Sequence, residues 1–254
     1  IIWTDGHIFN DMCGHGTIAL GMLMVAQGWV REGKDGRTTI RLETPAGLVT
    51  VEVASSAHTA EWTRFENVPA YVAEQDVPVD VPGYGTLKVD VAFGGNYFAI
   101  VKWDDPDLKI DPENGSRFQE LGLLIKQQID AKVTVRHPVK QHISYIDLIT
   151  FWHEPTRPDA LYRNVHVLSS GTMDRSPGGT GTSAMMAMFE ARGRIKIGQP
   201  IQSEGLLGSG TFEGCLLRET KLGEHRAVVP TVKGKANILG YAKWLMDPSD
   251  PVGQ

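Results

Sequence analysis

Residues 13–17 read Cys-Gly-His-Gly-Thr, and residues 178–182 read Gly-Gly-Thr-Gly-Thr, so both stretches have the form X-Gly-X-Gly-Thr. Each stretch opens an apolar run with helical spacing, GTIALGMLMVAQ at 16–27 and TSAMMAMFEARG at 182–193. The first positions are 165 residues apart, since 178 minus 13 is 165. This repeat predicts two related halves, each built on one glycine-started helix, although a glycine-rich match of five residues also arises by chance.

The rest of the chain reads mostly as strands. Runs of β-branched and other apolar residues, bounded by Gly, Pro or Asp, predict short strands at 38–42, 48–53, 87–93, 165–168 and 227–232. A third helix is expected at 114–129, with Ser116 as its cap. No shift in composition marks a domain boundary, and three helices among about a dozen strands predict an α+β fold.

The composition argues against several classes of partner. Of the 254 residues, 41% are hydrophobic and 22% are charged, which is ordinary for a globular protein. The net charge of -5 and the lack of Lys/Arg-rich runs argue against nucleic acid. We find no apolar stretch long enough for a membrane span, no signal peptide and no disulfide framework, and therefore expect a cytoplasmic protein without a membrane partner. The start at Ile1 and the stop at Gln254 predict a fragment trimmed at both ends.

The two glycine-rich turns are suited to bind an anion. The first amides of a helix have no intrahelical acceptor, and the helix dipole adds partial positive charge there. Two such helix starts facing each other would hold one small carboxylate and stabilise the charge that develops as the neighbouring carbon loses a proton. In that field Cys13 becomes a candidate base, although a lone cysteine is more often a small buried apolar residue. The pattern therefore predicts proton abstraction from an α-amino acid.

Other motifs give weaker signals. Neither turn carries the Lys of a P-loop or the GxGxxG spacing of a dinucleotide site, and no GxSxG or HExxH motif occurs. His137 and His142 form at most a loose metal pair, so we expect no metal and no cofactor. Cys215 lies in a strand-like run and is interpreted as packing. Asp174, just before the second turn, is either a capping carboxylate or the counter-ion of a substrate ammonium.

Five segments of the chain resemble motifs of the proline racemase family, which includes 4-hydroxyproline epimerases and trans-3-hydroxyproline dehydratases. They are MCGHGTIAL at 12–20, MDRSPGGTGTSA at 173–184, and the segments at 79–101, 203–214 and 240–253. The likeness covers essentially the whole chain in the family's order. It also implies that several dozen N-terminal residues of the family are absent from this sequence.

The resemblance implies a fold. That fold is α+β and diaminopimelate-epimerase-like, with two similar halves that each wrap a curved β-sheet around a central helix and an active site in the cleft between them. The first half would comprise residues 1–97 with about 240–254, its N-terminal strands missing, and the second half residues 98–239. A homodimer is compatible with the resemblance.

The resemblance also implies roles for single residues. The substrate would be proline or a hydroxyproline, and no cofactor would take part. Asp174 would bind the ring nitrogen of the substrate, and Cys13 would be one catalytic base. The residues whose amides would bind the substrate carboxylate are Gly14, His15, Gly179 and Thr180.

One position departs from the family. Racemases and epimerases have a second cysteine where this chain has Gly178, so that one thiolate removes a proton and the opposing thiol returns one. Dehydratases of the family manage without that thiol, because elimination of a 3-hydroxyl needs only a base at Cα and help for the leaving group. Dehydratases often have a hydroxyl residue at this position, so glycine matches neither pattern, but it fits one-base chemistry better than two-base chemistry and therefore favours a trans-3-hydroxy-L-proline dehydratase. The alternatives are a proline racemase or 4-hydroxyproline 2-epimerase with a non-thiol second acid, and a non-catalytic relative that only binds an amino acid.

Overall fold

The computed structural model describes residues 1–5, 8–57, 59–243, 245 and 248–249. This part of the chain contains three α-helices, a short 3-10 turn at Pro112–Asn114 and thirteen strands. The helices are α1 (Gly14–Ala26), α2 (Gly115–Lys132) and α3 (Gly179–Ala191). The strands are β1 (Trp3–Asp5), β2 (Ile8–Asn10), β3 (Arg37–Thr44), β4 (Gly47–Ser56), β5 (Thr59–Glu66), β6 (Tyr71–Val81), β7 (Gly85–Phe93), β8 (Tyr97–Lys102), β9 (Ile146–His153), β10 (Tyr162–Leu168), β11 (Pro200–Glu204), β12 (Thr211–Leu222) and β13 (His225–Gly234).

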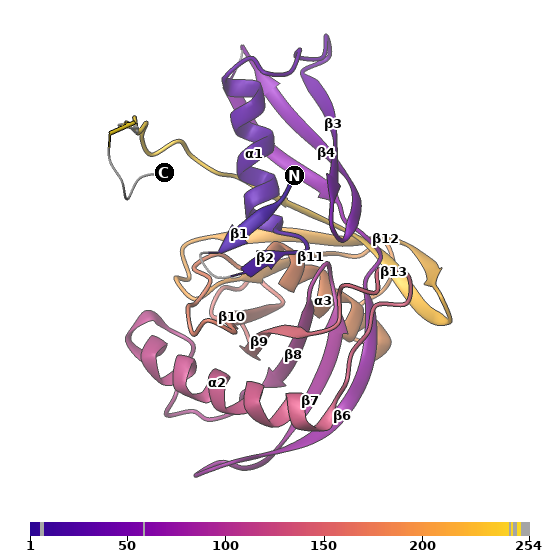
Figure 1. Cartoon of the computed structure of the whole chain (residues 1–254), viewed down its shortest axis with the longest axis vertical. Coiled ribbons are helices and arrows are strands. Elements are labelled where there is room, and N and C mark those ends of the chain that lie inside the picture. The colour runs from indigo at the N-terminus through magenta and orange to yellow at the C-terminus, as the bar shows by residue number, and fades with distance from the viewer. Residues whose placement is uncertain (6–7, 58, 244, 246–247, 250–254) are drawn as a thin grey trace.

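Eleven of these strands form one continuous sheet. Their order is β3-β4-β5-β13-β12-β11-β10-β9-β8-β7-β6, while β1 and β2 pair separately. The sheet curves back on itself, so that its β6 end approaches β13. This is shown by the β-bridge between Ala70, just before β6, and Val228 in β13. Figure 1 shows α1 with β3 and β4 as an upper lobe above the part that contains α2 and α3. The predicted α+β fold with curved sheet around central helices is confirmed.

The three helices differ in how much of their surface is covered. Residues 179–189 of α3 are all buried, because the curved sheet contacts α3 from β6, β7 and β8 and also from β12 and β13. This enclosure explains why residues 184–189 of α3 are apolar without interruption. Helix α1 packs on β4, β5 and β13, and α2 lies against β6, β9 and β10. None of the helices in the described part is long and apolar enough to cross a bilayer.

The sequence places the elements well but not all of their ends. The strands predicted at 38–42, 48–53, 87–93, 165–168 and 227–232 lie within β3, β4, β7, β10 and β13. Helices α1 and α3 begin earlier than predicted, at Gly14 and Gly179, because the first glycines already have helical backbone. Ser116 does not cap α2 as predicted but lies inside its first turn. The N-cap of α2 is Asn114, which makes no side-chain capping hydrogen bond, whereas the side chain of Asp111 caps the preceding 3-10 turn by accepting a hydrogen bond from the amide of Asn114 at 3.1 Å.

The two lobes share the sheet. Strand β13 pairs with β5 on one side and β12 on the other, so the strands around α1 and around α3 are joined. Strands β6 and β7, which a boundary at residue 97 assigns to the first half, are continuous with β8 in the part that surrounds α3. The division into 1–97 with about 240–254 and 98–239 stays a prediction, and part of 240–254 lies outside the described residues.

Candidate active site

The starts of α1 and α3 meet through their main chains. A Cβ atom built on Gly14 would lie 2.4 Å from the Cα of Gly179, and one built on Gly179 would lie 2.5 Å from the Cα of Gly14. Real Cβ contacts essentially never fall below 3.0 Å, so only glycine fits at either position while the helices stay this close. The two glycine motifs, far apart in the sequence, therefore bring the free amides of two helix starts together.

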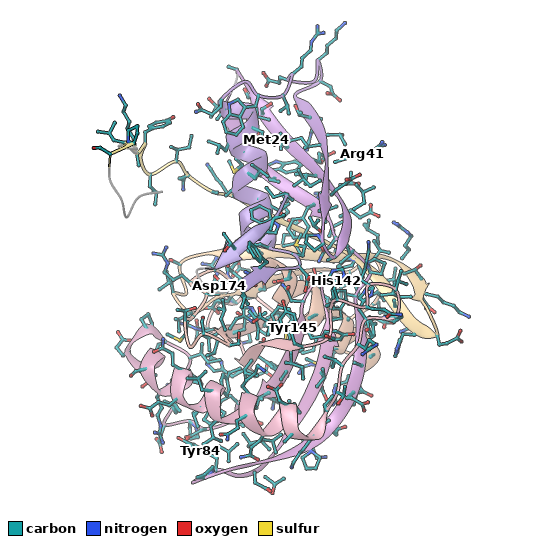
Figure 2. The ribbon with its side chains drawn as sticks, in the orientation of Figure 1. Met24, Arg41, Tyr84, His142, Tyr145 and Asp174 are labelled. Carbon is teal, nitrogen blue, oxygen red and sulfur yellow. The ribbon has the colours of Figure 1, made fainter. Side chains whose placement is uncertain are left out.

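A cavity of about 1080 Å³ opens beside this contact. Its walls include six of the seven residues singled out from the sequence: Cys13, Gly14, His15, Asp174, Gly179 and Thr180. Gly178 is not among the described residues that line it. Figure 2 labels Asp174 at the level where the lobe of α1 meets the rest of the molecule. The predicted site residues are thus gathered around one space, with Gly178 as the exception.

Cys13 is the residue directly before α1. It has extended backbone, with φ -131° and ψ 109°, and its carbonyl accepts hydrogen bonds from the amide and hydroxyl of Thr17 at 3.0 and 2.7 Å. Its thiol is free, and the residue is neither fully buried nor fully exposed. A Cβ atom built on Gly16 would lie 3.0 Å from Sγ of Cys13 and 2.7 Å from the ring of Trp3. Glycine at 16 therefore leaves room for the thiol and the indole beside the helix.

His15 and Asp174 connect the two helix starts by charge. Nδ1 of His15 lies 3.3 Å from Oδ2 of Asp174. Ser176 donates two hydrogen bonds to the same carboxylate, from its amide to Oδ1 at 2.8 Å and from its hydroxyl to Oδ2 at 2.9 Å. Hydrogen bonds with Asp174 and then with Cys13 raise the pKa of His15 well above 6.5, although burial opposes the shift. Burial disfavours the Asp174 carboxylate, but its contacts with His15 outweigh this and hold its pKa below the usual value. Cys13, His15 and Asp174 therefore form one connected group.

His166 lies behind the second glycine turn and is the residue that sequence reasoning missed. It is 1% exposed, and its ring nitrogens lie 2.8 Å from the hydroxyl of Thr150 and 3.0 Å from the carbonyl of Pro177. Burial lowers the pKa of its imidazole. No sequence signal marks this position, because YRNVHV at 162–167 reads as an ordinary buried strand.

The histidine pair considered as a metal site lies elsewhere. Nδ1 of His137 accepts hydrogen bonds from the amides of Val139 and Lys140 at 3.2 and 2.8 Å, and burial lowers its pKa to about 4. Nε2 of His142 lies 3.5 Å from Oδ1 of Asp11. Figure 2 labels His142 together with Tyr145. Neither histidine is among the described residues that line the cavity.

Cys215, the other cysteine, lies in β12 with its thiol 3.7 Å from the carbonyl of Leu216. Burial raises the pKa of its thiol. It is not among the described residues of the cavity wall, so the two cysteines occupy separate environments. The interpretation of Cys215 as packing stays a prediction, and the residue is partly buried.

Known proteins resemble this chain over its whole length. The family model described as Proline racemase matches residues 1–254. A 4-hydroxyproline 2-epimerase of Cereibacter sphaeroides is 58% identical over 252 residues, covering 99% of this chain and 75% of that protein. A proline racemase of Clostridioides difficile is 39% identical, again covering 99% of this chain and 75% of that protein. The crystal structure of a hydroxyproline epimerase from Agrobacterium vitis with bound trans-4-OH-L-proline has a TM-score of 0.92 at 30% identity, covering 99% of this chain and 72% of that one.

Proposed function

The chain belongs to the proline racemase family, and from that premise we propose that it epimerises 4-hydroxyproline at Cα without a cofactor. The chain is an enzyme of this family that acts on proline or a hydroxyproline. The choice of 4-hydroxyproline is supported by the relative that is 58% identical and named for that substrate. The expectation of trans-3-hydroxy-L-proline dehydration is not confirmed and becomes the second candidate.

The observation that carries the proposal is the main-chain contact between Gly14 and Gly179 beside Cys13. We call the amides of Gly14, His15, Gly179 and Thr180 the carboxylate cage, because they belong to the first turns of two helices that touch. A substrate carboxylate bound there accepts hydrogen bonds from both helices and lies at the positive end of both dipoles. As the Cα proton leaves, the electron pair moves into the carboxylate, and the same amides stabilise the added charge.

The connected side chains supply the proton transfer and the orientation. With the carboxylate in the cage, the thiolate of Cys13 takes the Cα proton and becomes a thiol. The carboxylate of Asp174 binds the protonated ring nitrogen of the substrate, and His15 holds that carboxylate ionised through the contact of 3.3 Å. The substrate is thereby fixed at two points, which directs its Cα–H bond toward one base.

Epimerisation also requires a proton on the face opposite Cys13, and Gly178 has no side chain to donate it. We propose that water supplies this proton, because a cavity of about 1080 Å³ admits solvent together with a small amino acid. The hydroxide that remains takes the proton from the Cys13 thiol, which restores the water and the thiolate. The glycine at 178 is also what keeps dehydration as the second candidate, since elimination needs only the base at Cα.

The test is incubation of the chain with 4-hydroxyproline, proline and trans-3-hydroxy-L-proline in heavy water, followed by NMR. We expect deuterium at Cα of 4-hydroxyproline together with formation of its C2 epimer. A pyrroline product from trans-3-hydroxy-L-proline, with no epimer from 4-hydroxyproline, would replace the proposal by the dehydratase. Binding without deuterium incorporation from any of the three compounds would identify a non-catalytic relative. Cys13→Ser and Cys215→Ser form a matched pair, because only Cys13 lines the cavity.

Three further expectations stay predictions: the cytoplasmic location, the homodimer and the independence from metal and cofactor. The small-molecule substrate follows from the family. A gel-filtration measurement of molecular mass decides the oligomeric state directly, with a mass near 27.9 kDa indicating a monomer.

A further inference from the structure

The buried imidazole of His166 occupies the space that a side chain at residue 178 would need. A Cβ atom built on Gly178 would lie 2.2 Å from Nε2 and 2.4 Å from Cδ2 of this ring. A Cβ atom built on Gly181 would lie 2.3 Å from Cε1 of the same ring. The ring therefore fits against two glycines of the second motif, and a larger residue at either position must displace it.

The two equivalent helix starts differ in one dihedral angle. Cys13 has φ -131° and ψ 109°, whereas Gly178 has φ 76° and ψ 113°. Because φ has the opposite sign, the Cβ directions at the two positions are not equivalent. At Gly178 this direction leads to the buried ring of His166, whereas Cys13 lines the cavity. With this backbone, a thiol at 178 would not face Cys13 across a substrate.

His166 also holds the second turn by hydrogen bonds. A carbonyl only accepts, so Nε2 carries the proton that is donated to Pro177 at 3.0 Å, and Nδ1 accepts from the hydroxyl of Thr150 at 2.8 Å. Nδ2 of Asn164, two residues earlier on β10, donates to the same carbonyl at 3.1 Å. Burial lowers the pKa of His166, which favours this neutral form. Both ring nitrogens are engaged, so the ring acts on the site through the turn.

We propose that His166 is a positioning residue that requires glycine at 178 and thereby commits this site to a single thiol. By holding the carbonyl of Pro177, the ring maintains the positive φ of Gly178 and orients the amides that follow it in the carboxylate cage. This proposal about His166 rests on the proposed function only where a carboxylate is chosen as the ligand. The steric coupling between residues 166 and 178 does not depend on it.

A double-mutant cycle between residues 166 and 178 tests the steric coupling. The variants are Gly178→Ala, His166→Ala and the double variant, and the readout is the midpoint of thermal unfolding, Tm. Gly193→Ala is the matched control, since Gly193 also has a positive φ of +70° but a Cβ there meets nothing within 4 Å. We expect Gly178→Ala to lower Tm by roughly 4 °C or more beyond the control. This excess should disappear when residue 166 is alanine.

Binding of pyrrole-2-carboxylate, a planar mimic of the carbanion, tests the positioning role by calorimetry. We expect His166→Ala to weaken binding roughly tenfold, because the carbonyl of Pro177 loses a donor and the turn is released. His166→Gln should restore most of the affinity, because its side-chain amide N–H can reach the same carbonyl. Alkylation of Cys13 by iodoacetamide without ligand should keep its wild-type rate in both variants, since Cys13 belongs to the other helix start.

The steric coupling and the positioning role can each be overturned by a different result. Equal losses for Gly178→Ala and Gly193→Ala, or a Gly178→Ala loss that ignores residue 166, overturn the coupling. Unchanged ligand affinity in His166→Ala overturns the positioning role. If Gly178→Ala folds only in combination with His166→Ala, the coupling is supported. If neither variant with alanine at 178 folds, the ligand affinities of His166→Ala and His166→Gln decide whether His166 positions the turn. Failure of the proposed function looks different, because wild type would then incorporate no deuterium while the cycle and the affinities keep the expected pattern.

Discussion

Replacing Gly14 by alanine should disable the site without altering any of its functional side chains. The new Cβ would lie 2.4 Å from Cα of Gly179 and 2.8 Å from the amide nitrogen of Thr180, and these backbone atoms cannot rotate away. Ordinary contact begins at 3.4 Å, so the two helix starts must separate by 3.4 minus 2.4, or 1.0 Å. A displacement of about 1 Å in a positioning element costs about 10²-fold in rate, equivalent to about 2.7 kcal/mol of transition-state stabilisation.

The assay is kcat/KM for epimerisation of 4-hydroxyproline, measured together with Tm. Gly21→Ala on the same helix is the control, because its Cβ would meet only side-chain methyl groups at 3.1 Å, which can move by a few tenths of an ångström. We expect both variants to lose some stability, on the order of 1–3 kcal/mol for overpacking, and only Gly14→Ala to lose activity on the scale above. A folded Gly14→Ala enzyme with wild-type kcat/KM would refute the reasoning that the cage depends on this contact.

Four further outcomes follow from the same site. Cys13→Ser should keep ligand binding but lower kcat by orders of magnitude in the deuterium-exchange assay, because a hydroxyl is a far weaker base, and an unchanged kcat would exclude Cys13 from proton transfer. Asp174→Asn should raise KM by roughly 10- to 100-fold for loss of a charge-assisted bond, whereas a wild-type KM would remove Asp174 from substrate binding. The pKa of His15 in the folded state lies above 6.5, so the pair of His15 with Asp174 contributes its full stability below pH 6.5, and this contribution declines as the pH rises. The variant His15→Ala should therefore have a lower Tm at pH 6, and its Tm should fall less steeply toward alkaline pH. Dialysis against a chelator should leave activity unchanged, and activity that returns only with added metal would contradict the mechanism.

The sequence was sufficient to find the two helix starts and to bring most of the site together. The reason is physical, since a glycine-rich turn that opens an apolar helix has few structural uses, and a cysteine directly before it narrows them further. Six of the seven candidate residues accordingly line one cavity. The strands were also readable, because β-branched runs such as 48–53 carry the signal of a buried strand without help from distant residues.

The remaining features depend on pairing over long distances, which no local pattern encodes. His166 meets Thr150 because β9 and β10 are antiparallel neighbours in which these two residues stand directly opposite each other. Shifting that register by one residue would turn the imidazole to the other face of the sheet. The ion pair of His15 with Asp174 likewise exists only because two helix starts touch. The sequence alone marks Gly178 as a departure from the family motif, but it does not reveal that His166 is its neighbour.

The ladder between β5 and β13 has a consequence for synthesis of the chain on the ribosome. Strand β5 ends at Glu66 and β13 begins at His225, so the 158 residues from 67 to 224 are translated between them, since 225 minus 66 minus 1 is 158. At ~5–20 residues per second, one edge of β5 waits roughly 8–32 s for its partner strand to be made. An unpaired edge is a template for association between nascent copies, and charged side chains reduce that risk. Strand β5 carries three charged residues, Glu61, Arg64 and Glu66, and such residues are the kind that reduce this risk while the edge is unpaired.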